Sequence, residues 1–149
     1  MKKIPYKIRP AKKSDQPAMA LVFQACYSAK PHTEKWSHGA ARKRISQLLR
    51  QSQTKGWAVT VMNRVVGFAF LQTRDGFNGT YGELQEAAIH PFFRRQGIGA
   101  ALLAEVRRFK KAKKLKVVYT LAYRGMFERF YKKSGFQPAK RSLIYVWKS

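Results

Sequence analysis

The segment from Glu83 to Leu103 constrains the fold of this chain more than any other stretch. It contains an apolar run that is typical of a buried strand, a stop at Pro91, and a turn that carries Gly97 and Gly99. Apolar residues beyond the turn recur at helical spacing, so a helix is predicted to begin at the glycines. Free N–H groups and the helix dipole make such a helix start a natural site for a phosphate or pyrophosphate.

Two other glycine-rich phosphate loops do not fit this segment. A dinucleotide-binding fingerprint requires a third glycine at position 102, where the chain has Leu102. A Walker loop requires Gly-Lys followed by Ser or Thr, and the chain lacks that sequence. The remaining pattern is Arg94-x-x-Gly97-x-Gly99 behind a strand, and Arg95 adds a further positive charge at the mouth of the turn.

This pattern resembles the acetyl-CoA pyrophosphate loop of the GNAT acetyltransferase superfamily, which reads Gln/Arg-x-x-Gly-x-Gly/Ala. An Ala-Ala-Leu-Leu helix follows it, and the sequence Phe-Tyr-Lys-Lys-Ser-Gly-Phe begins at Phe130. The resemblance extends from roughly Tyr6 to Trp147 and implies a single GNAT-like N-acetyltransferase domain over residues 1–149.

The implied fold class is α/β, with a mixed, mostly antiparallel central sheet of about six to seven strands and about four helices on its faces. The sheet is expected to splay between the strand ending near Ile89 and the strand near Leu115 to Leu121. The last strand, Arg141 to Trp147, is expected to close the sheet. An earlier hairpin is expected at Asn63 and Arg64.

The resemblance places cofactor contacts on the loop and on the strand before it. In the family, this strand bulges and its freed backbone N–H groups hydrogen-bond the thioester carbonyl and the pantetheine arm, which forms an oxyanion hole. The candidate cofactor-binding residues are Ala88, Ile89, Arg94, Arg95, Gln96, Gly97, Ile98, Gly99, Ala100 and Arg124.

Two positions depart from the family pattern. Many members have an Asn seven residues before the site tyrosine and an Ala three residues after that Asn, whereas this chain has Arg124 and Phe127 there. The open alternatives for Arg124 are the phosphate of the cofactor, an anionic acceptor, or solvent.

The candidate catalytic residues are Tyr131 and Glu83. Tyr131 stands where the family often has a tyrosine that protonates or hydrogen-bonds the CoA sulfur, and the alternative is a core aromatic residue. Glu83 stands where several members have a glutamate that deprotonates the amine, directly or through water. Strict strand alternation puts Glu86 on the opposite face unless a bulge intervenes, and a salt bridge is the alternative role for either carboxylate.

The loop from Ala29 to Gly39 is the expected specificity element, because in GNAT-like folds the segment between the first two helices borders the acceptor pocket. It carries His32, His38 and Trp36, which could equally serve packing or face solvent. Cys26 precedes this loop on an apolar helix face and is expected to fill the core.

Charge is the unusual feature of the composition. The chain has 31 Lys and Arg against 7 Asp and Glu, a net charge of +24, and it carries a nearly continuous basic run from Arg107 to Lys116. Such an imbalance favours nucleic acid, a ribosome or another polyanion as partner, and proteome-wide bias is the alternative explanation. Free polycationic amines would be repelled.

Cysteine, histidine and apolar-run patterns indicate the cellular environment of the protein. The single cysteine, Cys26, excludes an internal disulfide, no His or Cys stands at metal-ligand spacing, and the longest apolar run is too short for a bilayer. We therefore expect a cytoplasmic, metal-free protein without membrane association, either a monomer or a homodimer.

Two functional hypotheses follow. The first is an N-acetyltransferase that moves an acetyl group from acetyl-CoA to a primary amine in a ternary complex, with an acceptor on or near an anionic partner. The second is a non-catalytic GNAT-like module that binds CoA or nucleic acid and acts as a regulator.

Overall fold

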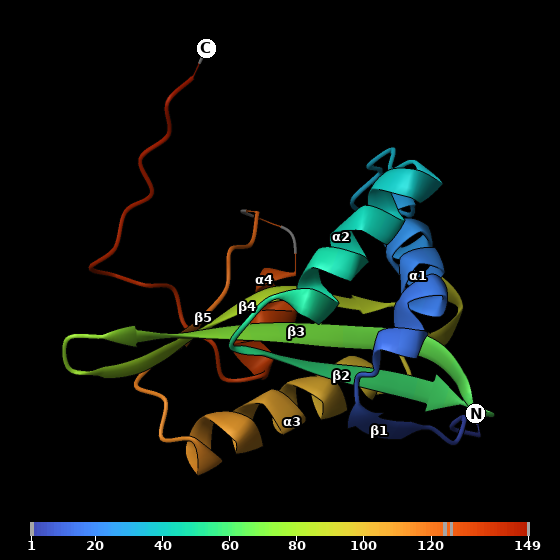
Figure 1. Ribbon diagram of the computed structural model, residues 1–149, viewed down its shortest axis with the longest axis horizontal. Helices are drawn as coiled ribbons and strands as arrows, with labels where there is room; N and C mark the ends of the chain where they lie inside the picture. Colours follow the sequence, from blue (N-terminus) through green and yellow to red (C-terminus); the bar gives the residue numbers. More distant parts are fainter. Residues whose placement is uncertain (1, 124, 126, 149) are drawn as a thin grey trace.

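The computed structural model describes residues 2–123, 125 and 127–148, and this part of the chain forms one five-stranded sheet with helices on both faces (Figure 1). The strands are β1 (Lys7–Pro10), β2 (Thr54–Val61), β3 (Arg64–Gly76), β4 (Gly79–Ile89) and β5 (Val118–Tyr119). The helices are α1 (Gln16–Ser28), α2 (His38–Arg50), α3 (Ile98–Ala112) and α4 (Glu128–Lys133), with single 3-10 turns at Lys13–Asp15 and Pro91–Phe93.

The strands lie side by side in chain order, from β1 at one edge to β5 at the other. The first four are antiparallel to their neighbours, and β5 runs parallel to β4. The tight connection between β2 and β3 is formed by Met62 and Asn63, which have φ angles of 48° and 64°. The hairpin therefore turns one residue earlier than the Asn63–Arg64 pair that was expected.

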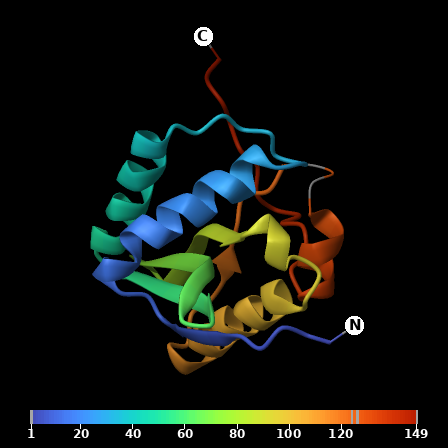
Figure 2. The same ribbon diagram turned by 90° about the vertical axis from the view of Figure 1, so that its right-hand side faces the viewer.

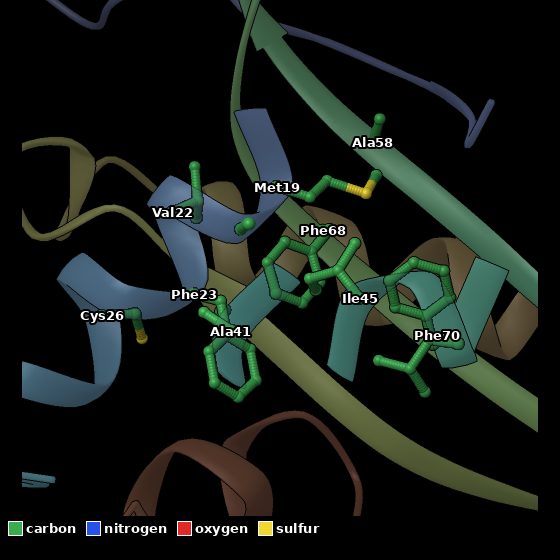
Figure 3. Close-up of a cluster of buried hydrophobic side chains, with 12 residues drawn as sticks. Met19, Val22, Phe23, Cys26, Ala41, Ile45, Ala58, Phe68 and Phe70 are labelled. Atoms are coloured by element: carbon green, nitrogen blue, oxygen red, sulfur yellow. The ribbon is translucent and has the colours of Figure 1, made fainter. Parts of the chain in front are cut away.

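Two apolar cores hold the layers together, one on each face of the sheet. Helices α1 and α2 cover one face, and α3 covers the other (Figure 2). In the first core, Phe23 of α1 and Ile45 of α2 pack with Phe68 and Phe70 of β3 (Figure 3). Cys26 belongs to this core, as expected, and it is a free thiol.

β4 carries an irregularity that determines which of its side chains share a face. Phe70 pairs with Glu86 and Leu71 pairs with Leu84, so Gln85 is an extra residue in β4. A bulge of this kind interrupts strict alternation. Leu84 consequently packs in the α3 core, whereas Glu86 faces α1 and α2.

The expected splay is present between β4 and β5. These strands pair only at Gly82 with Val118 and at Glu83 with Tyr119. Immediately beyond, the Thr120 hydroxyl donates to the Leu84 carbonyl at 3.0 Å, and the strands then diverge. The end of β4, up to Ile89, is thereby left open on its β5 side.

The expectation of six to seven strands is wrong for the described residues, which contain five. The 141–147 segment forms no strand there, and it extends away from the body with Tyr145 88% and Trp147 101% exposed (Figure 1). Its β-branched and aromatic residues favour a strand only where a neighbouring strand pairs with them. β5 is also shorter than the 115–121 segment, because Leu115 enters the α3 core instead.

Candidate functional site

The open end of β4 forms one wall of a cleft of about 1070 Å³. α1 and the loop behind it form a second wall, and the start of α3 forms a third. Residues 120–123 and α4 complete the lining. The cleft therefore lies where the sheet splays, and each wall comes from a different part of the chain.

The start of α3 supplies backbone donors to this cleft. Gly97 caps the helix with φ 78°, a left-handed conformation that favours glycine. The Ala101 N–H bonds the Gly97 carbonyl at 3.1 Å, so the N–H groups of Ile98, Gly99 and Ala100 precede the first intrahelical bond. A Cβ built on Gly97 meets no atom within 4 Å, which leaves space for an anionic group above the helix start.

Glycine is needed at position 99 for a different reason, which is the close packing of α4 on α3. A Cβ at this position would lie 3.1 Å from the ring of Phe130, so the glycine lets α4 approach α3 closely. This contact fixes the position of Tyr131, which follows Phe130 and lines the cleft.

Most of the expected cofactor-binding residues line the cleft. Those that do are Ala88, Ile89, Arg94, Arg95, Gly97, Ile98, Gly99 and Ala100. Gln96 is not among the lining residues of the described chain, and Arg124 lies outside the described residues.

Arg94 also makes contacts that its motif does not predict. Its guanidinium donates to the Lys30 carbonyl at 3.0 Å and to the Cys26 carbonyl at 3.3 Å. The loop before α3 is thus tied to the end of α1. Burial raises the pKa of the Cys26 thiol, while Arg94 and the Ile89 N–H oppose that rise, and a thiol with a raised pKa is a poor nucleophile.

Tyr131 projects into the cleft from α4. Its ring packs edge-on against Phe130 and Phe136. Burial raises the pKa of its phenol, and the charge of Glu86 adds to the rise, while the Thr120 side chain opposes it. The phenol therefore keeps its proton at neutral pH and remains a hydrogen-bond donor.

The two candidate carboxylates occupy different places. Glu83 lies outside the cleft lining, where Arg74 pairs with it at 3.1 Å. Glu86 lines the cleft; it accepts a 2.6 Å hydrogen bond from the Tyr27 hydroxyl and pairs with Arg44 at 3.1 Å. Burial raises the pKa of Glu86, and its partners Tyr27 and Arg44 oppose this.

Sequence reasoning missed several residues of this site. Tyr27 and Arg44 were not singled out, although both contact Glu86. The signal that could have found Tyr27 is its place at the end of α1, directly before the loop expected to border the acceptor. That loop does contribute to the cleft, through His32 and Glu34 among others.

Neither a metal-binding cluster nor a helix able to cross a membrane is found among the described residues. No group of three or more His, Cys, Asp or Glu side chains in residues 2–123, 125 and 127–148 is placed to hold a metal ion. No helix within those ranges is long and apolar enough to cross a membrane.

Comparisons with known proteins agree on the fold. The domain model described as "Acetyltransferase (GNAT) domain" matches residues 52–138. No curated protein sequence matches the chain significantly.

Three solved structures illustrate the likeness. A possible acetyltransferase from Clostridium difficile 630 superposes with a TM-score of 0.83 at 15% identity, over 97% of each chain. Aminoglycoside N-acetyltransferase AAC(6')-Iy in complex with CoA gives 0.74 at 18% identity, over 97% of this chain and 96% of the other. Ribosomal-protein-alanine N-acetyltransferase from Brucella melitensis biovar Abortus 2308 gives 0.74 at 17% identity, over 97% and 100%.

Proposed function

The chain belongs to the GNAT acetyltransferases, because the matching domain model spans more than half of it, and from this premise we propose that it is an acetyl-CoA-dependent N-acetyltransferase. One observation carries the proposal. The helix start at Gly97, the splayed end of β4 and the phenol of Tyr131 line a single cleft. These three features match the needs of acyl transfer from a thioester: an anion site, backbone donors for a carbonyl, and an acid for the departing sulfur.

Acetyl-CoA supplies an activated acyl group when it binds. The N–H groups of Ile98, Gly99 and Ala100 would hold its pyrophosphate, with Arg95 adding positive charge. The His90 N–H bonds the Val66 carbonyl of β3, so alternation along β4 turns the Ala88 N–H toward β3 as well and leaves the Ile89 N–H on the open side. The backbone N–H group of Ile89 would polarise the thioester carbonyl there. Tyr131, which keeps its proton at neutral pH, would donate that proton to the sulfur as the thiol leaves.

The acceptor would enter from the α1 side of the cleft. Glu86 is the carboxylate there, and a carboxylate held by Tyr27 and Arg44 has a fixed position from which to attract an ammonium group. We therefore assign this role to Glu86 and not to Glu83, because Arg74 holds Glu83 outside the cleft lining.

The basic surface suggests where the acceptor amine comes from. Six basic side chains of the run from Arg107 to Lys116 are exposed, and Lys110 is half-buried. The exposed ones are Arg107, Arg108, Lys111, Lys113, Lys114 and Lys116. A polyanion would offset the mutual repulsion of these charges. We propose an amine carried on or next to a polyanion such as an RNA or a ribosome as the acceptor, in the cytoplasm.

Substitution of Tyr131 by Phe tests the enzymatic proposal. The variant should keep its affinity for CoA and lose about 100-fold or more in acetyl transfer, because only the proton donor is removed. Tyr145→Phe is the matched control, since Tyr145 is exposed at 88% and lies outside the cleft lining. Transfer is measured as release of free CoA thiol from acetyl-CoA in the presence of amines, beginning with ribosomes and tRNA.

A second function, a regulatory module that binds CoA or nucleic acid without turnover, is favoured by the net charge of +24. If Tyr131→Phe and the wild-type protein both bind CoA and neither releases CoA thiol with any acceptor, this second function replaces the first.

A further inference from the structure

His32 lies in the loop behind α1, at the acceptor end of the cleft. Its ring centroid is 4.7 Å from that of Tyr27 and 5.2 Å from that of Phe127. The imidazole thus lies between the α1 wall and the start of α4. Phe127 is one of the positions where the chain departs from the GNAT pattern, so this ring contact is a feature of this chain's own sequence.

One ring nitrogen of His32 is buried and lacks a hydrogen bond. Nδ1 has no hydrogen-bonding partner among the described residues, and Oε2 of Glu34 lies 3.6 Å from it. Nε2 also has no hydrogen-bonding partner among the described residues, but unlike Nδ1 it is not fully buried. Nε2 is therefore the ring nitrogen that an acceptor in the cleft can reach.

Hydrogen bonds with Trp36 and Tyr27 hold Glu34 in position beside the imidazole. The Trp36 indole donates to Oε1 of Glu34 at 3.1 Å, which turns Oε2 toward the imidazole. The Glu34 N–H also bonds the Tyr27 carbonyl at 2.7 Å, and this fixes the loop against α1. A carboxylate beside Nδ1 favours the tautomer with the proton on Nδ1 and leaves the lone pair on Nε2.

Burial, with help from Arg94, favours the neutral form of the His32 ring. Burial lowers its pKa, Arg94 from the loop before α3 lowers it further, and Glu34 partly opposes both. Tyr27 of α1 contributes an uncharged phenol, since its pKa is raised by burial and by Glu86. Glu86 of β4 is paired with Arg44 of α2, so these two charges partly compensate each other.

Glu86 is less suited than His32 to accept a proton from the acceptor. Its Oε2 already accepts from Tyr27, and its Oε1 accepts from Arg44 at 3.2 Å. Burial raises the pKa of Glu86, but a further proton on either oxygen would compete with the donor already bound there. The imidazole Nε2 has no such partner among residues 2–123, 125 and 127–148.

We propose that His32 is the base that deprotonates the acceptor amine and that Glu34 is its positioning residue. This inference rests on the proposed acetyl transfer. The ammonium proton moves to Nε2, giving a neutral amine and an imidazolium whose charge Glu34 stabilises. The amine nitrogen then bonds to the acyl carbon, the carbon–sulfur bond breaks, and the thiolate takes its proton from Tyr131. The second proton that the nitrogen loses as the amide forms restores the phenol of Tyr131, and the imidazolium releases its proton to water.

NMR measurement of the His32 tautomer tests the proposed arrangement of Glu34 and His32 without any acceptor present. In uniformly 15N-labelled protein, the imidazole nitrogens of the three histidines are assigned with His32→Gln. We expect a neutral ring at pH 7 with its proton on Nδ1. Glu34→Gln should lower the pKa of His32 further, because it removes the nearby negative charge that raises it. A proton on Nε2, or a pKa unaffected by Glu34→Gln, overturns the proposal.

Kinetics test the chemical role. Benzylamine is a suitable probe, because it has one amine and a ring that can pack on Tyr27 and Phe127. In His32→Gln, acetylation of benzylamine should fall about 100-fold or more at pH 7. Glu34→Gln should move the acid limb of kcat/KM to lower pH. His38→Gln is the matched control, because the structure places His38 at the exposed start of α2 and outside the cleft lining.

These results separate the two proposals. If His32→Gln is as active as His38→Gln, His32 is not the base, although the protein is still an acetyltransferase. If the wild-type protein does not bind acetyl-CoA, the proposed function fails whatever the tautomer of His32.

Discussion

The Tyr27 hydroxyl donates a 2.6 Å hydrogen bond to Oε2 of Glu86 and joins the end of α1 to the bulged part of β4. The two residues are 59 positions apart in the chain. The bond is made because Gln85 adds a residue to β4 and turns Glu86 toward α1. It fixes a carboxylate in the cleft and links the two walls between which an acceptor would bind.

Removal of this hydrogen bond should change how Glu86 titrates. In Tyr27→Phe the pKa of Glu86 should rise further, because the bond lowers it in the wild-type protein. A carboxyl whose pKa is raised on folding stabilises the protein below its unfolded value of about 4.3, and that stabilisation is lost as the pH rises through its folded pKa. In Tyr27→Phe the loss should extend to higher pH.

The pKa of Glu86 can be followed by NMR of its side-chain carboxyl carbon, and the free energy of unfolding by urea denaturation at pH 5 and pH 7.5. Tyr145→Phe serves as control, because Tyr145 is exposed. An unchanged or lower pKa of Glu86 in Tyr27→Phe would show that the hydrogen bond does not stabilise the carboxylate.

Substitution by alanine should have different effects at the two glycines that begin α3, Gly97 and Gly99. Gly97→Ala should reduce the free energy of unfolding by about 1–2 kcal/mol, because φ is 78° and a Cβ is strained there. Gly99→Ala should displace the Phe130 ring, which lies 3.1 Å from the new Cβ, and should impair the site through the neighbouring Tyr131.

Gly39→Ala is the matched control for these variants. Gly39 lies in α2 with no atom within 4 Å of a built Cβ, so alanine there should stabilise the protein by about 0.5–1 kcal/mol. Urea denaturation compares all three. Equal stability of Gly97→Ala and Gly39→Ala would contradict the left-handed conformation of Gly97.

Sequence patterns predicted the local parts of this site well. The strand, the glycine turn and the helix between Glu83 and Leu103 follow from periodicity and glycine placement, and the structure confirms them. The splay of the sheet, which the family resemblance implied, is also confirmed. These features depend on interactions between residues close in the chain or on a shared fold.

Long-range contacts could not be predicted in the same way. The bulge at Gln85 depends on how β4 pairs with β3, so alternation alone could not tell which of Glu83 and Glu86 enters the cleft. The contact of Arg94 with the Cys26 carbonyl spans 68 positions, and no local pattern encodes it. The strand expected at 141–147 failed for a related reason, because apolar alternation does not identify a pairing partner.

Arg9 and Asp15 should make a measurable contribution to stability. The guanidinium forms two 2.8 Å hydrogen bonds with the buried carboxylate. Asp15→Asn should cost about 1–3 kcal/mol at pH 7, because a buried, charge-assisted pair is broken. The hydrogen bond from Arg9 lowers the pKa of Asp15. The contribution is therefore complete above the unfolded pKa of about 3.9 and is lost as the pH falls through the folded value.

Urea denaturation of wild type and Asp15→Asn at pH 7 and at pH 3 checks this. Asp75→Asn is the control, because Asp75 is exposed in β3. A difference between wild type and Asp15→Asn that does not shrink at pH 3 would mean that the Asp15 charge is not responsible.

The basic run should govern any affinity for RNA. Neutralising four of its lysines should weaken binding of single-stranded RNA and reduce the slope of log K against log salt by about 0.7 for each lysine that contacts a phosphate. The variant carries Lys110→Gln, Lys111→Gln, Lys113→Gln and Lys114→Gln. A control variant with four exposed lysines replaced elsewhere carries Lys12→Gln, Lys13→Gln, Lys35→Gln and Lys43→Gln.

Fluorescence anisotropy with a labelled oligonucleotide at several salt concentrations measures both variants. If both variants lose the same affinity, RNA binding depends on the total charge of the protein and not on a defined surface. If neither variant changes the salt slope, the basic run has no role in binding.

The most direct measurement is calorimetric titration of the nucleic-acid-free protein with acetyl-CoA. The account predicts binding with a Kd in the micromolar range, about −8 kcal/mol at 1 μM, and clear weakening by Gly97→Val, which strains the helix start and fills the space above it. Absence of binding by the wild-type protein, or equal binding by Gly97→Val, would contradict the assignment of this cleft to CoA.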